Sequence, residues 1–473
     1  MEPIALTWIA EALNARIIGT LNGIARGICT DTRQGADGAL FFALQGENAD
    51  GHNYVAQAFA AGAVGAVVSR AIEGAKGPLL VVPDTLRALG DLANRYRQQF
   101  AIPVVGITGS VGKTSTKEMI AAVLRTKYRT LASDKNFNNE IGVPLTLLQL
   151  TKAHETAVIE MGMRGLGEID RLAEIAQPTV GVITQIGYAH IERLGSQQQI
   201  AQAKSELLAR LPAGSFALLP YRDRFYDYLK SRVPAGCTVL SFGEGGEEAW
   251  PPDVRLYPVP SRANGCAEAR VMIYRQEFFL TLRAFGAHHL HNAGAALAAA
   301  YALDVPLKQA IAALEAWEGA PGRMVVRHTP DGLTILDDCY NAGPESMEAA
   351  LQTLALETIV NGVAVLGDMK ELGDFASEAH RAVGQKVVAA QVKLLVTVGE
   401  LARETEAGAR EYAARIGRPM PPVRHFADAE AAAAHIGEIV TPKDTVLVKG
   451  SRAMQMERIV AALTGEPTGD AHG

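Results

Sequence analysis

The sequence has little cysteine, and the residues it has are scattered. Cys29, Cys237, Cys266 and Cys339 form no CxxC pair. A disulfide framework or a zinc site of the usual spacing is therefore not expected, and a reducing compartment suits the chain.

Long apolar runs are missing as well. No run approaches the ~18 residues that a membrane-spanning helix needs, so no membrane span is expected. The first residues, MEPIALTWIAEALNARIIG, lack the basic segment that precedes the apolar core of a signal peptide. We therefore expect a cytoplasmic protein.

An excess of positive charge is also absent. The 45 Lys and Arg residues face 51 Asp and Glu residues, which gives a formal net charge of −6 with histidine neutral. A general nucleic-acid binder normally shows a basic surface, so no nucleic-acid partner is expected. A phosphate-binding site is a local feature and remains compatible with this charge balance.

The chain does have the length and composition of a multidomain globular protein. Its 473 residues are 48% hydrophobic and 20% charged, too many for one hydrophobic core. Residues 1–99 open with an amphipathic helix pattern, LTWIAEAL, for which Thr7 is the expected N-cap. Residues 100–320 and 321–473 both alternate strand and helix patterns, and EGAPGRM breaks both periods between them.

Strand patterns recur throughout the chain as apolar, β-branched runs. They occupy 38–44, 64–69, 100–110, 155–162, 178–187, 214–220, 333–338, 362–368, 393–399 and 445–450. Helix patterns lie between most of them. We therefore expect an α/β fold of three domains, with mainly parallel sheets covered by helices on both faces.

The most informative motif is VVGITGSVGKTSTKEMIAAVL at 104–124. A strand pattern runs into a glycine-rich loop, and Gly-Lys-Thr then opens a helix pattern. Backbone N–H groups of such a loop surround phosphate oxygens, and the helix N-terminus favours negative charge. We expect Lys113 to reach the β- and γ-phosphates of ATP and the Thr114 hydroxyl to bind Mg²⁺. The expected loop residues are Thr108, Gly109, Ser110, Val111, Gly112, Lys113 and Thr114.

The loop departs from the standard pattern at one position. Ile107 stands where that pattern has a glycine six residues before the lysine. An ordinary glycine turn is the alternative, but Gly-Lys-Thr between a strand and a helix argues against it.

Three polar residues gain meaning only beside this loop. Glu160 ends the strand pattern AVIE, His190 follows GVITQIG, and Lys204 lies in the helix pattern QAKSELL. Ligands of parallel sheets bind beyond the C-terminal ends of strands, where Glu160 and His190 are expected. Taken singly, the three residues are as well explained as a solvated acid, an ordinary histidine and a surface lysine.

Motifs along nearly the whole chain resemble those of the Mur ligase family of peptidoglycan synthesis. They are TGSVGKTS, NFNNEIGVPLTLL, IEMGMRGLGEI, IGYAHIERLGS with AKSELL, HHLHNAGAALAA, APGRM, LDDCYNAGPESM, LGDMKELG and LVKGSRAMQMERIV. The resemblance implies an N-terminal UDP-binding domain, a central ATPase domain and a C-terminal Rossmann-like domain. Within the family, the C-terminal motifs are most similar to those of the branch that adds D-alanyl-D-alanine.

This resemblance implies a reaction, cofactors and substrates. The tripeptide carboxylate of UDP-N-acetylmuramoyl-tripeptide would be joined to the amine of D-alanyl-D-alanine, with ATP and Mg²⁺ as cofactors. The route is an acyl-phosphate, because a carboxylate is a poor electrophile until a good leaving group is attached. A monomer is expected.

The family's metal site carries over onto four residues. Thr114 and Glu160 would hold one Mg²⁺ and His190 a second. Lys204 resembles a lysine that many family members carry as a carbamate, which is an anion that helps to hold the metal; an unmodified Lys204 could instead pair with phosphate. Lys113, Glu160, His190 and Lys204 form the expected catalytic set.

Further contacts are implied by the resemblance, each with an ordinary alternative. For ATP they are Asn139 at the γ-phosphate (or a cap), Asn292 at adenine (or an N-cap), Arg323 at phosphate and Asp338 at the ribose or base (or a turn acid). For the UDP-sugar they are Thr30, Asp31, Arg33 and His52. For the dipeptide carboxylate they are Lys449 and Ser451, at the start of a helix that would bind the anion.

Other functions remain open on the sequence alone. The tripeptide synthase of this family shares the TDTR and GHNY features, but its usual C-terminal recognition motif is not found here. A folylpolyglutamate-type synthase is a second alternative. A nucleotide-driven switch or motor is a third, and it leaves the TDTR and GHNY features unexplained. For a ligase, hinges are expected near 318–324 and 98–102, so that domain closure completes the site.

Overall fold

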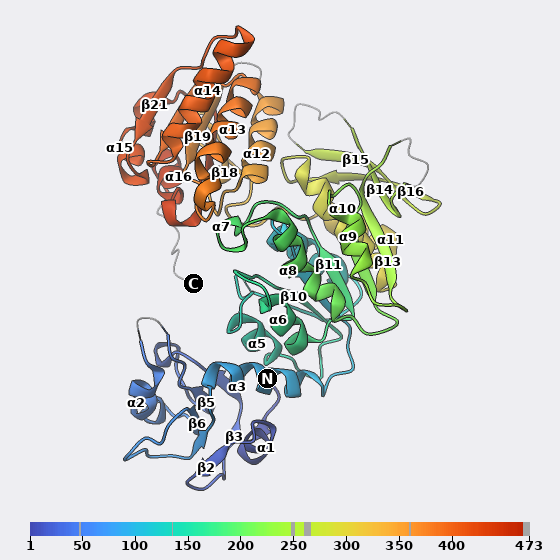
Figure 1. Cartoon of the computed structure of the whole chain (residues 1–473), viewed down its shortest axis with the longest axis vertical. Helices are drawn as coiled ribbons and strands as arrows, with labels where there is room; N and C mark the ends of the chain where they lie inside the picture. Colours follow the sequence, from blue (N-terminus) through green and yellow to red (C-terminus); the bar gives the residue numbers. More distant parts are fainter. Residues whose placement is uncertain (47–48, 135, 247–250, 260–265, 359–360, 467–473) are drawn as a thin grey trace.

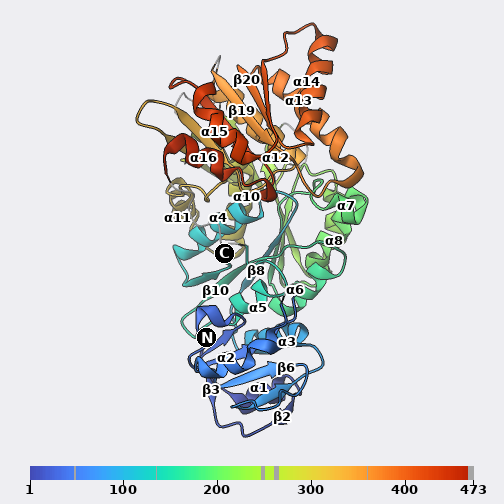
Figure 2. The ribbon, with the colours of Figure 1, turned by 90° about the vertical axis from the view of Figure 1, so that its left-hand side faces the viewer.

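The apolar runs of the chain assemble into sheets of two, five, nine and six strands. The computed structural model describes residues 1–46, 49–134, 136–246, 251–259, 266–358 and 361–466. We call the parts built around the three larger sheets the N-terminal, central and C-terminal lobes. Figure 1 shows the lobes stacked in chain order, and Figure 2 shows the same stack from the side. The expected α/β fold of three parts is confirmed.

The N-terminal lobe contains the five-stranded sheet, in the order β2-β7-β6-β5-β4. Only β2 runs antiparallel to its neighbour. The strands are β2 (Arg16–Ile18), β4 (Gly27–Cys29), β5 (Ala39–Phe42), β6 (Gly65–Val68) and β7 (Leu79–Val81), and β1 (Ile4–Ala5) pairs with β3 (Ile24–Ala25). The helices are α1 (Leu6–Ala12) and α2 (Val55–Ala60). Thr7 lies inside α1 and is not its N-cap, because the helix begins directly after Ala5.

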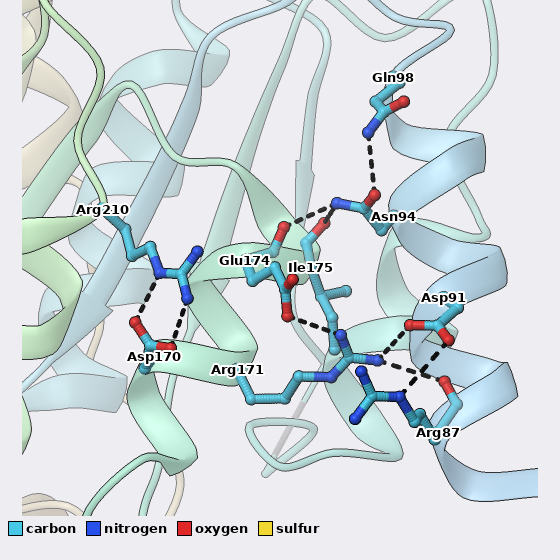
Figure 3. A network of polar contacts seen from close by, with 9 residues as sticks. All are labelled: Arg87, Asp91, Asn94, Gln98, Asp170, Arg171, Glu174, Ile175 and Arg210. Atoms are coloured by element: carbon cyan, nitrogen blue, oxygen red, sulfur yellow. Dashed lines mark hydrogen bonds and ion pairs between the residues drawn. The ribbon is translucent and has the colours of Figure 1, made fainter. Parts of the chain in front are cut away.

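Helix α3 (Thr85–Arg97) joins this lobe to the central one (Figure 3). Arg171, on α6 (Glu168–Ala176), places Nη2 2.6 Å from Asp91 Oδ1 of α3. Asn94 Nδ2 donates to the Glu174 carbonyl at 2.7 Å. The Arg97 guanidinium donates to the carbonyl oxygens of Ala176, Phe100 and Ile102. These contacts fasten residues 98–102 to the central lobe and count against the hinge predicted there.

The central sheet has the order β16-β15-β14-β13-β12-β11-β8-β10-β9. It is parallel from β9 to β14, and β15 and β16 extend it as an antiparallel hairpin. Its strands are β8 (Val104–Thr108), β9 (Thr130–Ala132), β10 (Thr156–Glu160), β11 (Val180–Ile183), β12 (Phe216–Pro220), β13 (Thr238–Glu244), β14 (Val254–Val259), β15 (Ala267–Ile273) and β16 (Gln276–Leu282).

Both faces of the central sheet are covered by helices, because successive strand residues point to opposite sides. Val105 and Ile107 of β8 face a core with α4 (Lys113–Arg125), α10 (His288–Ala302) and α11 (Leu307–Glu315). Val104 faces the other core, which includes α6 and α8 (Gln197–Ala209). Each fully buried leucine or isoleucine in these layers stabilises the lobe by about 1.5–3 kcal/mol. The shorter helices are α5 (Gly142–Leu147), α7 (Ile191–Leu194) and α9 (Tyr226–Ser231).

The C-terminal lobe has a sheet in the order β17-β18-β22-β19-β20-β21, parallel except for β17. The strands are β17 (Val325–His328), β18 (Thr334–Asp338), β19 (Gly362–Gly367), β20 (Leu394–Val398), β21 (Val423–Phe426) and β22 (Thr445–Lys449). The helices are α12 (Pro344–Glu357), α13 (Ala376–Ala389), α14 (Ala402–Ile416), α15 (Ala429–Ile439) and α16 (Glu457–Thr464). Within the described residues, no helix has the length and apolar character of a membrane span.

Candidate functional site

The predicted phosphate loop connects β8 to α4 and lies against the end of β11. Ser110 N donates to the Gln185 carbonyl at 2.8 Å, and Thr184 Oγ1 donates to the Val111 carbonyl at 2.5 Å. A Cβ at Gly109 would come within 1.9 Å of Thr184 Oγ1. Only glycine fits at 109, because the loop approaches the neighbouring strand end so closely.

Gly112 gives the loop its last turn before α4. Its φ is +84°, in the left-handed region, and a Cβ there would lie 2.6 Å from Asn292 Oδ1. Asn292 is buried within α10 and accepts a hydrogen bond from Thr116 Oγ1 at 3.2 Å. The expected adenine contact thus packs against the loop and its helix. Its position inside α10 excludes the N-cap alternative.

Several buried oxygen atoms around the loop have no hydrogen-bond partner among the residues that the structure describes. They are Thr108 Oγ1, Ser110 Oγ and Glu160 Oε2. Glu160 ends β10, which pairs with β8 so that Glu160 stands opposite Ile107. Nearly all buried polar atoms in native proteins are paired. Hydroxyl groups can donate to phosphate oxygens, and a carboxylate can bind the metal ion that accompanies the phosphate. These residues therefore fit a phosphate with its metal ion.

Two lysine side chains lie near each other at the same place. Lys113 Nζ donates to the Gly109 carbonyl at 2.9 Å. Lys204, on α8, is 1% exposed, and its Nζ makes no hydrogen bond or ion pair with any residue that the structure describes. Burial holds the pKa of Lys204 well below its ordinary value, and the Lys113 charge lowers it further. Burial also lowers the pKa of Lys113, although Glu160 opposes this. The site is built to receive negative charge.

Glu160 is oriented by a residue that the sequence analysis missed. Asn138 Nδ2 donates to Glu160 Oε1 at 2.8 Å. Its neighbour Asn139, expected at the γ-phosphate, is exposed and accepts hydrogen bonds from the Ile141 and Gly142 amides at 3.2 and 2.8 Å. These hydrogen bonds stabilise the turn that leads into α5, and the contact of Asn139 with the γ-phosphate stays a prediction. The motif NFNNEIG contains both asparagines, and its spacing gives no sign of which one faces Glu160.

The oxygen donors around the loop suit a Mg²⁺ ion that is bound together with a nucleotide. Among the described residues, no cluster of three or more His, Cys, Asp and Glu side chains could hold a metal ion alone. Mg²⁺ on a nucleotide needs no such cluster, because it is bound by one or two carboxylates together with phosphate oxygens and water. Glu160, at the end of β10, and Thr114, in the first turn of α4, fit this way of binding Mg²⁺.

Arg323 brings the segment between the central and C-terminal lobes to the loop. Its Nη2 donates to Thr114 Oγ1 at 3.1 Å, and its guanidinium lies 4.3 Å from the centre of the Tyr340 ring. His190, after β11, places Nδ1 2.8 Å from Glu371 Oε2 of the C-terminal lobe. Arg323 of APGRM therefore reaches the start of α4, and Glu371 beyond APGRM reaches the segment that follows β11.

The predicted contacts within the C-terminal lobe engage partners in their own lobe. Lys449 is buried, and its Nζ lies 2.6 Å from Asp338 Oδ2. The lysine predicted to contact the dipeptide and the aspartate predicted to contact the nucleotide therefore form an ion pair with each other. Lys449 Nζ also donates to the Asn341 carbonyl at 3.0 Å. Ser451 is buried and its Oγ accepts a hydrogen bond from the Lys370 amide at 2.8 Å. In this arrangement the three side chains lie at or just beyond the C-terminal ends of β18 and β22.

The predicted UDP contacts lie in the N-terminal lobe, away from the loop. Asp31 accepts a hydrogen bond from the Arg33 amide and lies 2.6 Å from its guanidinium, whose side chain is 86% exposed. This pairing lowers the pKa of Asp31. Thr30 beside them is half-buried. Arg33 is therefore accessible to an anionic ligand.

His52 differs from the other three predicted UDP contacts. It is 4% exposed, its Nδ1 lies 2.6 Å from Asp50 Oδ1, and its Nε2 accepts a hydrogen bond from the Ser69 amide at 2.9 Å. Both ring nitrogens are used within the lobe. The proposed contact of His52 with uridine stays a prediction, and this geometry counts against it.

Comparison with known families and proteins agrees with this arrangement. Models described as "Mur ligase family, catalytic domain", "Mur ligase middle domain" and "Mur ligase, glutamate ligase domain" match residues 25–97, 107–300 and 322–452. The UDP-N-acetylmuramoyl-tripeptide--D-alanyl-D-alanine ligase of Synechocystis is 38% identical over 441 residues, covering 93% of this chain and 92% of the relative.

Solved structures give the same picture. MurF from Acinetobacter baumannii superposes with a TM-score of 0.89 at 33% identity, covering 98% of this chain and 100% of that one. MurF ligase from Thermotoga maritima, in complex with ADP, has a TM-score of 0.82 at 28% identity and covers 93% and 98%. With these matches over nearly its full length, and with its phosphate loop, buried lysines and strand-end carboxylate in one place, the chain belongs to the Mur ligase family.

Proposed function

We propose that the protein is an ATP-dependent ligase that joins the tripeptide carboxylate of UDP-N-acetylmuramoyl-tripeptide to the amine of D-alanyl-D-alanine. The relatives named for this activity support it, and one structural neighbour is a complex with ADP. One observation carries the proposal. Lys113 and the buried Lys204 lie near the buried Glu160 and near hydroxyl groups that have no hydrogen-bond partner among the described residues, which suits phosphoryl transfer.

The chemistry would proceed in two steps. The carboxylate oxygen takes the γ-phosphoryl group and ADP leaves, which gives an acyl-phosphate. The amine nitrogen then attacks the acyl carbon, and loss of a proton and of phosphate leaves the amide. Both steps gather negative charge at one place, so catalysis rests on positioning and electrostatic stabilisation.

The residues of this chain have distinct roles in that scheme. Lys113 neutralises the transferring phosphoryl group, and the loop amides with Thr108 and Ser110 hold the phosphate oxygens. When bound, Mg²⁺ supplies charge neutralisation between phosphate oxygens; Glu160 and Thr114 would hold one ion and His190 a second. At Lys204, either a carbamate on Nζ or a phosphate oxygen beside it would supply the missing negative charge. Arg323 reaches the phosphates from the C-terminal side.

The remaining assignments complete the proposal. We place domain boundaries after residues 99 and 320, which is consistent with one of the three larger sheets in each part. Asn292 would contact adenine, and Thr30, Asp31 and Arg33 would contact the UDP group. A cytoplasmic location and a monomeric state remain predictions from the sequence.

A phosphate-release assay tests the function directly. With UDP-N-acetylmuramoyl-tripeptide, ATP and Mg²⁺, we expect release with D-alanyl-D-alanine and little with single amino acids, and mass spectrometry should identify the dipeptide adduct. Lys113→Ala should lower the rate by about 10²-fold or more, because it removes a charge that stabilises the transferring phosphoryl group. Lys127→Ala, at an exposed lysine beyond the end of α4, is the matched control.

Two outcomes would reject the proposal. Amide formation that survives Lys113→Ala would exclude the phosphate loop from the reaction. ATP hydrolysis of equal rate without carboxylate and amine would favour the switch or motor alternative.

A further inference from the structure

Two carboxylates of the C-terminal lobe contact one loop of the central lobe. Tyr188 N donates to Glu345 Oε1 at 2.9 Å, and a Cβ at Gly187 would come within 2.4 Å of that oxygen. Two residues further on, His190 Nδ1 lies 2.8 Å from Glu371 Oε2. Glu345 lies in the first turn of α12, and Glu371 follows β19. The loop that follows β11 is thus held by both carboxylates.

The backbone at the second contact is constrained on both sides. His190 has φ +66° and Glu371 has φ +63°, both in the left-handed region that non-glycine residues rarely adopt. Such conformations are strained and persist where the surroundings impose them. A Cβ at Gly373 would lie 2.9 Å from Glu192 of α7, so the segment after Glu371 rests on the helix that follows His190. Figure 1 shows α7 directly below the C-terminal lobe.

The pair has a defined chemical consequence for the imidazole ring. A carboxylate accepts hydrogen bonds only, so it favours the tautomer with the proton on Nδ1 and leaves the Nε2 lone pair free. Histidine ligands of metal ions usually donate their other N–H to such a partner, which fixes the ring orientation. The segment after β11 that leads to His190 also contacts the phosphate loop, because Gln185 accepts a hydrogen bond from the Ser110 amide and Thr184 Oγ1 donates to the Val111 carbonyl.

We propose that Glu371 is a positioning residue, which the C-terminal lobe supplies to orient the His190 ring for the second Mg²⁺. The inference rests on the proposed function, in which His190 holds that ion. It adds that this metal site depends on docking of the C-terminal lobe. Glu345 assists by fixing the backbone of the same loop through the Tyr188 amide.

The full-length protein with Glu371→Ala or Glu371→Gln provides the test. The control is Glu411→Gln, an exposed carboxylate that pairs with Arg381 inside the C-terminal lobe. The first measurement is the Mg²⁺ concentration for half-maximal ligation at saturating substrates. The second is Mn²⁺ binding in the presence of ADP, followed by electron paramagnetic resonance, which needs no turnover.

Glu371→Ala should raise the half-maximal Mg²⁺ concentration and weaken one Mn²⁺ site by about 10-fold or more, the usual effect of losing a partner of a metal ligand. The KM for ATP should change less. Glu371→Gln keeps an acceptor without the charge and should fall between Glu371→Ala and the wild type. This isosteric variant also keeps the test valid if the alanine variant folds poorly.

The possible outcomes separate the two hypotheses. Unchanged metal binding in both Glu371 variants, or a change matched by Glu411→Gln, would overturn the role of Glu371 and leave the ligase function in place. A wild-type protein that binds Mn²⁺ with ADP but forms no amide would reject the ligase function. The Mn²⁺ comparison would then still decide whether Glu371 orients His190.

Discussion

His289 is a buried residue beside the site whose role was not anticipated. It is 1% exposed, and neither of its ring nitrogens has a hydrogen-bond partner within the described parts of the chain. Its ring lies 5.3 Å from that of Trp317 and 4.2 Å from that of His288. Burial holds the pKa of His289 well below its ordinary value, and the charges of His288 and Arg323 lower it further. The ring is therefore neutral at neutral pH.

This depressed pKa predicts a loss of stability in weak acid. Between the folded-state pKa and the ordinary value of 6.5, the unfolded chain binds more protons at this position. The contribution of His289 to the free energy of unfolding is therefore fully present above about pH 6.5. It is lost as the pH falls from that value toward the folded-state pKa. Between pH 7.5 and 5.5, the Tm of His289→Gln should decrease less than the Tm of the wild type, as measured by tryptophan fluorescence. The exposed His435→Gln is the control; equal losses in all three proteins would contradict the prediction.

At the residue scale, the sequence predicted which residues form the site better than it predicted which of them contact each other. Lys113, Glu160 and Lys204 belong to local motifs and converge because parallel strand ends meet at one edge. Partner choice depends on packing between distant segments, which local spacing does not encode. Asn138 rather than Asn139 therefore faces Glu160, and Lys449 pairs with a strand end 111 residues away.

At the element scale, several fully buried strands could be predicted, whereas short edge strands and the inner strands β13 and β14 could not. The runs at 38–44, 155–162 and 362–368 correspond to β5, β10 and β19, whose residues are all buried. The strands β9, β17 and β21 were missed. They have three or four residues and are only partly buried, so their conformation comes from the neighbouring strand rather than from their own sequence.

The helix pair α13 and α14 provides a prediction at this scale. A Cβ at Gly384 of α13 would come within 2.1 Å of the Thr405 carbonyl oxygen of α14. Backbone cannot move aside as a side chain can, so Gly384→Ala should force the helices apart and cost about 1–3 kcal/mol. Gly437→Ala, in α15, has open space at its Cβ and should instead stabilise the protein by up to about 1 kcal/mol. Urea unfolding of both variants provides the comparison, and a Gly384→Ala protein as stable as the wild type would contradict the contact.

At the scale of the whole molecule, the two connections between lobes differ. Residues 98–102 are fastened to α6 through Arg97, whereas 318–324 join the lobes at Pro and Gly residues, with Arg323 in contact with the loop. Movement is therefore expected at the second connection. Small-angle scattering should show a smaller radius of gyration with a non-hydrolysable ATP analogue and both substrates than without them. An unchanged radius would contradict closure at 318–324.

The fastening of α3 has a consequence for which substrate lengths the protein would accept. Arg171, Asn94 and Arg97 hold the N-terminal lobe at a set distance from the phosphate loop. A chain-like substrate anchored at one end in that lobe would place its other end at a reach decided by the scaffold. The helix would thus fix the distance between the two binding sites. A peptide one residue too short or too long would not place its carboxylate within reach of the γ-phosphoryl group.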